Sequence, residues 1–267
     1  MLGLGSTLIG GAVVSADFTA ASISSLDLWY DFSTLTGSDG DAVSSFANGG
    51  DAGSDYNLSQ GTAGRRPLLE TGDMALNSLK FDNNDDRLSL DNVYVTTDQT
   101  FTFFVVFETG QAGTDIFMGG DNTVNNENFI SLAGANGVAI QTRFNGVTGG
   151  ANNNTVTTKT DGTESGGTNG DGDHTFRENT PEIMVMTRAA DEEMRFYNFE
   201  GTLICTEDSA TNNSSNTNFR VQTIGADGGG SGAHQGTIGE IGLYNKVLSS
   251  GEISSLTTHL ASKWSVT

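Results

Sequence analysis

Residues 236–253, GTIGEIGLYNKVLSSGEI, carry most of the information about the fold. The apolar residues of 238–243 predict a buried strand, which ends in a turn. Ser249 or Ser250 can then cap a short helix that runs on to residue 264. Glu252 falls in the first turn of this helix, where a negative charge is stabilising. The stretch therefore predicts a closing strand followed by a C-terminal helix.

Three other segments have the patterns of β-strands. Residues 26–32, LDLWYDF, alternate apolar and polar side chains, as a half-buried strand does. Residues 79–90, LKFDNNDDRLSL, predict a hairpin, in which Asn83 can adopt the positive φ of a tight turn. Residues 101–108, FTFFVVFE, are apolar on both faces, which predicts a central strand between two layers.

Together these motifs resemble those of laminin-G-like, concanavalin A-like jelly-roll domains. The resemblance rests on the closing G-x-I-x-E strand with its L-S-x-x-E-I helix start, the L-x-L-W strand, and the L-x-F-D-x-x-D-D-x-L hairpin after Arg66-Pro67. It covers residues 26–264. It implies an all-β, two-sheet antiparallel jelly-roll sandwich with a short C-terminal helix. That fold hosts lectins, glycanases, adhesins and purely structural domains, so it does not identify a chemistry.

The composition agrees with one large β domain. The chain has 267 residues, with 36 glycines and only 2 prolines. We expect about eleven to thirteen strands in a domain at residues 23–267. Residues 145–180 are rich in Gly, Asn and Thr, and they predict a long flap or weak hairpin.

Residues 1–22 predict an N-terminal docking arm. The segment is apolar but broken by glycine, and no Lys or Arg precedes Arg65, so the basic region of a signal peptide is missing. It is also too short to span a membrane. The apolar residues expected to dock on an assembly partner are Leu2, Leu4, Leu8, Ile9, Val13 and Val14.

The charge excludes two classes of partner. The formal net charge is −21, from 33 acidic and 12 basic residues. Such a surface repels nucleic acid and anionic lipid. The single cysteine, Cys205, cannot form an intrachain disulfide, and its position in a predicted strand indicates a buried structural thiol.

The sequence does not predict an enzyme. Glycanases of the resembling superfamily carry acids spaced as E-x-D-x-x-E on one strand, and this chain has no such spacing. It also lacks the G-x-S-x-G motif of a nucleophile elbow. The histidines, His174, His234 and His259, are expected on the surface. We therefore predict no catalytic residues.

Two kinds of binding site remain open. Asp82, Asp85 and Asp86 place carboxylates on one turn, as a calcium site requires, although Asp is also an ordinary turn residue. No other cofactor is expected. Glycan binding would need an exposed aromatic surface, for which Tyr56 and Tyr94 are candidates.

Large aromatic residues predict the core. Trp29 and Trp264 occupy motif positions that indicate burial. We expect the core to depend on Trp29, Phe81, Phe103 and Tyr244.

The opening MLGLGS, joined to a laminin-G-like domain, resembles virion proteins of tailed phages that infect marine cyanobacteria. The resemblance implies a non-enzymatic capsid decoration protein or tail adhesin on the virion surface, assembled in the host cytoplasm. Its partners would be the major capsid protein or tail proteins, within an oligomeric assembly, together with a host surface glycan. The alternative is a carbohydrate-binding or adhesive module of a cell-surface protein.

Overall fold

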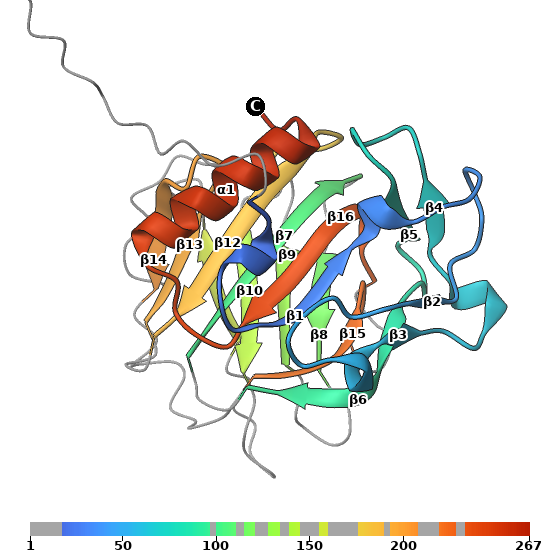
Figure 1. Cartoon of the computed structure of the whole chain (residues 1–267), viewed down its shortest axis with the longest axis horizontal. Helices are drawn as coiled ribbons and strands as arrows, with labels where there is room; N and C mark the ends of the chain where they lie inside the picture. Colours follow the sequence, from blue (N-terminus) through green and yellow to red (C-terminus); the bar gives the residue numbers. More distant parts are fainter. Residues whose placement is uncertain are drawn as a thin grey trace, which may run out of the picture.

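The described part of the chain is a two-sheet antiparallel β-sandwich with one α-helix outside it (Figure 1). This confirms the predicted fold class, while the narrower concanavalin A-like assignment stays a prediction. The computed structural model describes residues 18–96, 100–110, 115–120, 128–133, 139–144, 155–159, 176–189, 193–207, 219–227 and 233–267.

The first sheet has the strand order β14–β13–β12–β7–β16–β5–β4, and β1 pairs with β16 beside this path. Its strands are β1 (Leu26–Asp31), β4 (Leu68–Glu70), β5 (Ser78–Asp82), β7 (Phe101–Thr109), β12 (Glu182–Arg188), β13 (Met194–Tyr197), β14 (Leu203–Glu207) and β16 (Gln235–Tyr244). β1 and β5 lie end to end along one side of the long strand β16.

The second sheet has the order β11–β10–β9–β8–β15–β6–β3–β2. Its strands are β2 (Ser45–Phe46), β3 (Leu58–Ser59), β6 (Leu88–Val95), β8 (Asp115–Gly119), β9 (Asn128–Ala133), β10 (Ala139–Phe144), β11 (Thr155–Lys159) and β15 (Arg220–Ile224). Short 3-10 turns are η1 (Ala20–Ser22), η2 (Phe32–Thr34), η3 (Ser54–Tyr56) and η4 (Ala63–Arg65). The described residues thus contain sixteen strands, more than predicted, because β2, β3 and β4 are too short to leave an apolar pattern.

β7 lies between two apolar layers, as its sequence predicted. Phe103, Val105 and Phe107 point into the core between the sheets, while Phe104 and Val106 belong to a second core on the outer face of the first sheet. Both faces of the strand are buried because the second sheet covers one and the helix covers the other.

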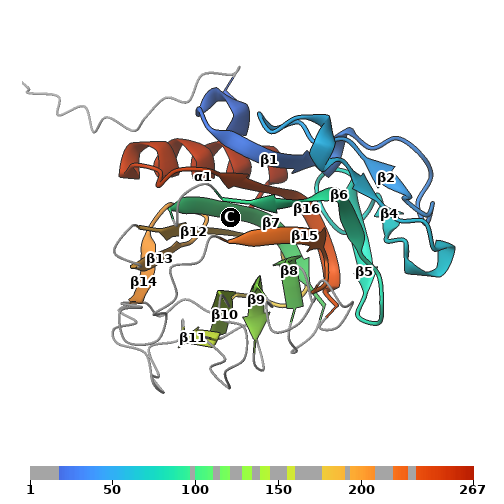
Figure 2. The ribbon, with the colours of Figure 1, turned by 90° about the horizontal axis from the view of Figure 1, so that it is seen from below.

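Helix α1 (Ser250–Trp264) forms this third layer (Figure 2). Ile253, Leu256, Leu260 and Trp264 are buried at the helical spacing, so one face of α1 packs on the sheet. Among the described residues, no helix is both long and apolar enough to cross a membrane.

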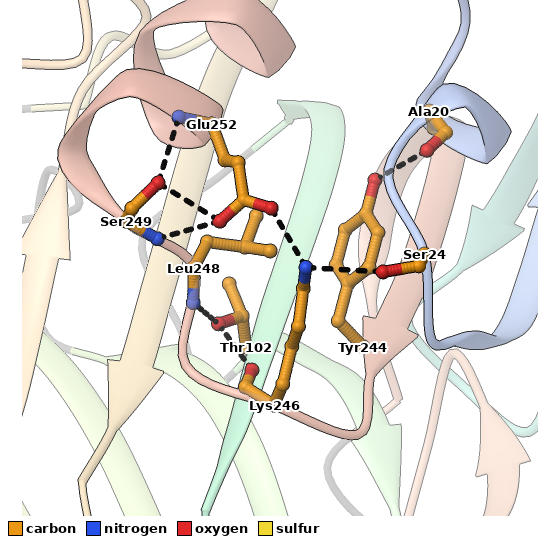
Figure 3. A network of polar contacts seen from close by, with 8 residues as sticks. All are labelled: Ala20, Ser24, Thr102, Tyr244, Lys246, Leu248, Ser249 and Glu252. Carbon is orange, nitrogen blue, oxygen red and sulfur yellow. Dashed lines mark hydrogen bonds and ion pairs between the residues drawn. The ribbon is translucent and has the colours of Figure 1, made fainter.

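Polar contacts fix the start of α1 (Figure 3). The Ser249 hydroxyl accepts a hydrogen bond from the Glu252 amide at 3.3 Å, and the Glu252 carboxylate accepts one from the Ser249 amide at 2.8 Å. Lys246 donates to Glu252 at 2.7 Å and to Ser24 at 3.4 Å. The Lys246 ammonium and the Ser249 amide hold the pKa of Glu252 below its ordinary value. This arrangement confirms the predicted helix cap.

The arm prediction falls mainly on residues 1–17, which lie outside the described residues together with all six of its apolar residues. Residues 18–22 pack on the sandwich: Ala20 is buried and its carbonyl accepts a hydrogen bond from the Tyr244 hydroxyl at 2.8 Å (Figure 3). Of the predicted flap, β11 pairs with β10, and residues 145–154 and 160–175 lie outside the described residues.

Most of the predicted core residues are confirmed. Phe103 and Tyr244 are fully buried, and Phe81 is 2% exposed. Cys205 is also buried. Trp29 is an exception, because it is only partly buried and lies on the outer face of the first sheet.

Candidate functional site

A pocket of about 280 Å³ lies on the outer face of the first sheet, beside the end of α1. Two aromatic rings, Trp29 and Phe46, form its apolar surface. Asp31 and Thr34 supply its polar side chains. The remaining lining residues are Ala47 and Gly49.

The alternation of β1 places Trp29 and Asp31 in this pocket. Leu28 and Tyr30 face the core and are fully buried, so Trp29 and Asp31 face outward. Asn48, which lies between the lining residues Ala47 and Gly49, accepts a hydrogen bond from the Trp29 amide at 2.8 Å. Gly49 approaches the ring so closely that an added Cβ would lie 3.0 Å from Cε3 of Trp29.

A buried carboxylate fixes the Trp29 ring. Glu240 is 0% exposed and lies directly opposite Asp31 in the pairing of β1 with β16. Its Oε1 accepts a hydrogen bond from Trp29 Nε1 at 2.7 Å, and its Oε2 accepts one from Trp264 Nε1 at 3.1 Å. Because both indoles donate to one rigid acceptor, the exposed edge of Trp29 has a defined position.

One lysine bridges two facing acids. Like charges directly opposite each other across two strands destabilise a sheet. Lys263 Nζ lies 2.6 Å from Asp31 Oδ1 and 2.6 Å from Glu240 Oε2, so it bridges them. This bridge offsets the repulsion between the two facing carboxylates.

Asp31 has one oxygen available to a ligand. Its Oδ1 accepts hydrogen bonds from the amide and the hydroxyl of Ser33, at 3.2 and 2.6 Å, as well as the contact with Lys263. Within the part of the chain that the structure describes, Oδ2 has no donor. The pocket therefore offers an aromatic surface and an oriented acceptor to a small ring with an apolar face and hydroxyl groups.

A second hollow, of about 510 Å³, lies at the start of α1. It is lined mainly by serines, with Phe18 and Glu252. Its helix end is already capped by Ser249 and Glu252, and Phe18 packs on His259 at 5.6 Å between ring centroids. Among its described lining residues, this second hollow therefore has neither an uncapped helix N-terminus nor an aromatic ring free to stack on a ligand.

The structure brings the predicted calcium ligands together. Asp82, Asp85 and Asp86 have carboxylate oxygens within 4.8 Å of one another, on the turn between β5 and β6. Asn83 has the expected positive φ of 63°. The predicted hairpin is wrong, because this turn carries the chain from β5 in the first sheet to β6 in the second, and the two strands do not pair. Burial, with the neighbouring charges of Asp82 and Asp85, raises the pKa of Asp86 to about 7.

Turn contacts already occupy two of these acids. Asp82 accepts a hydrogen bond from the Asn84 amide at 2.9 Å, and Asp85 pairs with Arg65 at 3.2 Å. The donor set suits a hard cation, and calcium binding stays a prediction.

Two expectations about single residues were wrong. His234 is not on the surface: it is 0% exposed, and its ring contacts Phe81 and Phe117. Tyr94 cannot serve as a platform because it is 4% exposed and packs on Tyr56. His174 lies outside the described residues.

The sequence reasoning missed the aromatic pocket. The alternation of β1 could have predicted that Trp29 faces outward, since it shares a face of the strand with Asp27 and Asp31. Phe46, in contrast, follows a Gly- and Ser-rich stretch with no strand pattern, so nothing in the sequence joins it to Trp29.

No protein-family model matches the chain, and no curated protein matches it. Solved structures with a similar fold include the binding domain of Paraclostridial Mosquitocidal Protein 1, with a TM-score of 0.54 and 13% identity. The match covers 88% of this chain and 52% of the other, so the chain spans about half the length of that protein.

Two further matches are weaker. The binding domain of Botulinum neurotoxin serotype G has a TM-score of 0.48 and 13% identity, over 83% of this chain and 52% of the other. The CBM40 of Ruminococcus gnavus IT-sialidase, bound to α2,3 sialyllactose, has a TM-score of 0.43 and 13% identity, over 61% of this chain and 84% of the other. The likeness to the binding domain of Paraclostridial Mosquitocidal Protein 1 indicates a shared fold and nothing finer, and the two weaker matches add nothing to it.

Proposed function

We propose that this chain is a non-catalytic glycan-binding module, with the pocket at Trp29 as its sugar site. The observation that supports it most is the Trp29 ring, partly exposed and held by Glu240. Aromatic rings bind the apolar face of a sugar, and a rigid ring loses little entropy on binding. Asp31 Oδ2 would accept a hydrogen bond from a sugar hydroxyl.

The same geometry argues against glycoside hydrolysis at this site. Asp31 and Glu240 are close enough to share Lys263, as the two acids of a retaining glycosidase are close together. Glu240, however, is fully buried, and both of its oxygens accept hydrogen bonds from protein groups. A sugar in the pocket would reach only Asp31, so the pair cannot act on one glycosidic bond.

A glycan array probed with the full chain tests this function, with isothermal titration calorimetry on the glycans that bind. Trp29→Ala should weaken binding about tenfold or more, because the stacking surface is lost. Val247→Ala is the matched control, since Val247 is 40% exposed and does not line the pocket. Binding that survives Trp29→Ala in a folded protein would contradict the assignment of the site.

The virion role stays a separate prediction. A glycan-binding module can belong to a virion surface protein or to a cell-surface protein, and the pocket does not distinguish them. The predicted arm and its capsid or tail partners involve residues 1–17, outside the described residues. A protein census of purified particles would test both this role and the predicted location on the virion surface after assembly in the host cytoplasm.

A further inference from the structure

We propose that the pocket at Trp29 accepts neutral sugars and excludes sugars that carry a carboxylate, such as sialic and uronic acids. This inference rests on the proposed glycan-binding function and adds a charge requirement to it. It follows from the charges placed in and behind the pocket wall.

The pocket has a local excess of negative charge. Among the described residues, Asp31 is the one charged residue that lines it, and Glu240 lies directly behind Trp29. Lys263 supplies a single positive charge between these two carboxylates. The three groups together therefore carry one net negative charge when all are ionised.

Lys263 is not free to turn towards a ligand. Its ammonium lies 2.6 Å from each carboxylate, and its side chain is only 18% exposed. Moving it to a ligand carboxylate would leave Glu240 buried without a counter-charge, which is strongly unfavourable. The cation thus stabilises the protein and is not available for recognition.

The polar side chains that line the pocket are Asp31 and Thr34, and the Thr34 hydroxyl already donates to the Asp31 carbonyl at 2.9 Å. Asp31 Oδ2 can accept a hydrogen bond from a sugar hydroxyl, which is a donor. A ligand carboxylate has no proton to donate at neutral pH, and it would meet Asp31 as a like charge. Neutral sugars gain a hydrogen bond at the position where acidic sugars meet repulsion.

The charge of the whole chain acts in the same direction. A formal net charge of −21 slows the approach of polyanionic glycans, and salt screens this effect. The repulsion from Asp31 acts at short range and is screened less. Selectivity that persists at high salt would therefore report on the pocket itself.

The experiment compares paired glycans on an array, each neutral oligosaccharide beside its sialylated or uronic-acid counterpart, at low and high salt. The neutral member of each bound pair should bind on the order of tenfold more tightly. Equal or tighter binding of the acidic members would overturn the charge requirement and leave the glycan-binding function intact. Failure of every glycan would overturn both.

Asp31→Asn assigns the selectivity to one carboxylate. The amide oxygen can still accept a hydrogen bond from Ser33, and Lys263 keeps its ion pair with Glu240. The protein should therefore fold. The ratio of neutral to acidic affinity should fall towards one. Glu200→Gln makes the same change in net charge on the exposed turn between β13 and β14, and it should leave the ratio unchanged. An equal fall in both variants would overturn the role of Asp31.

Discussion

At the scale of single residues, the site depends on groups that are close in space and distant in sequence. Glu240 lies 211 positions from Trp29, to which it is hydrogen bonded. Local patterns cannot reveal such a pair, because each residue also fits an ordinary position in its own strand. The Asp82, Asp85 and Asp86 cluster could be predicted because all three acids share one turn.

Gly49→Ala should narrow the pocket with little effect on the fold. The new Cβ would lie 3.0 Å from the Trp29 ring, tighter than ordinary contact, so the ring or the loop must shift. Since binding depends on the position of this ring, we expect a severalfold loss of glycan affinity and a stability change below about 1 kcal/mol. Gly61→Ala is the control, because an added Cβ there meets nothing within 4 Å. Calorimetry and thermal melts of both variants measure the two effects.

Asp86→Asn should stabilise the protein at pH 8 and have little effect near pH 4. The pKa of Asp86 is about 7 in the folded state, above its ordinary 3.8. Between these values the unfolded carboxyl has released its proton while the folded one keeps it, so wild-type stability falls as the pH rises towards 7. Above pH 7 the full cost of ionising the folded carboxyl is present, and its removal should raise the free energy of unfolding by about 4 kcal/mol at most, less to the extent that solvent screens the carboxylate. Denaturant titrations at both pH values would contradict this if the gain were larger at pH 4.

Bound calcium should offset the loss of stability that accompanies ionisation of Asp86. A divalent cation between Asp82, Asp85 and Asp86 would favour their ionised forms, so calcium should raise the melting temperature at pH 8 relative to a chelator. Asp82→Asn should reduce this response. An unchanged melting temperature at millimolar calcium would leave the cluster as turn structure alone.

At the scale of elements, prediction succeeded where the signal is local. The apolar run of β7 and the serine cap of α1 are properties of consecutive residues, and both are confirmed. The motif position of Trp29 predicts burial, and this prediction is wrong because the alternation of β1 turns the side chain to the outer face. β2 and β3 have two residues each, too few for any periodicity.

Phe103→Ala tests the central place of β7. The ring is fully buried between the two sheets, so its removal should cost roughly 3–5 kcal/mol. A denaturant titration measures the cost, and Val95→Ala, at a residue 38% exposed, is the control with an expected change within about 0.5 kcal/mol. A cost for Phe103→Ala below about 1 kcal/mol would contradict the packing of the inner core.

At the scale of the whole molecule, the helix layer and the pocket form one unit. Lys263 and Trp264, from the last turn of α1, reach the carboxylate that holds Trp29. A change that loosens the packing of α1 should therefore alter the pocket at Trp29 through Glu240. The cluster of Asp82, Asp85 and Asp86 lies on the turn that connects β5 of the first sheet to β6 of the second, and it shares none of these contacts among the described residues, so the two candidate sites should respond independently.

Deletion of residues 2–16 tests the predicted docking arm independently of the folding of the sandwich. Both apolar cores of the described residues are built from residue 18 onward, with Phe18 and Ala20 packed in the helix layer. The shortened chain should therefore fold, with a melting temperature close to that of the full chain, and keep its glycan affinity. If the arm docks on an assembly partner, for example by adding a strand to a sheet edge, the shortened chain should fail to join the particle or complex that contains the full chain. Normal incorporation would contradict the docking role, while loss of the thermal transition would show that the segment belongs to the sandwich.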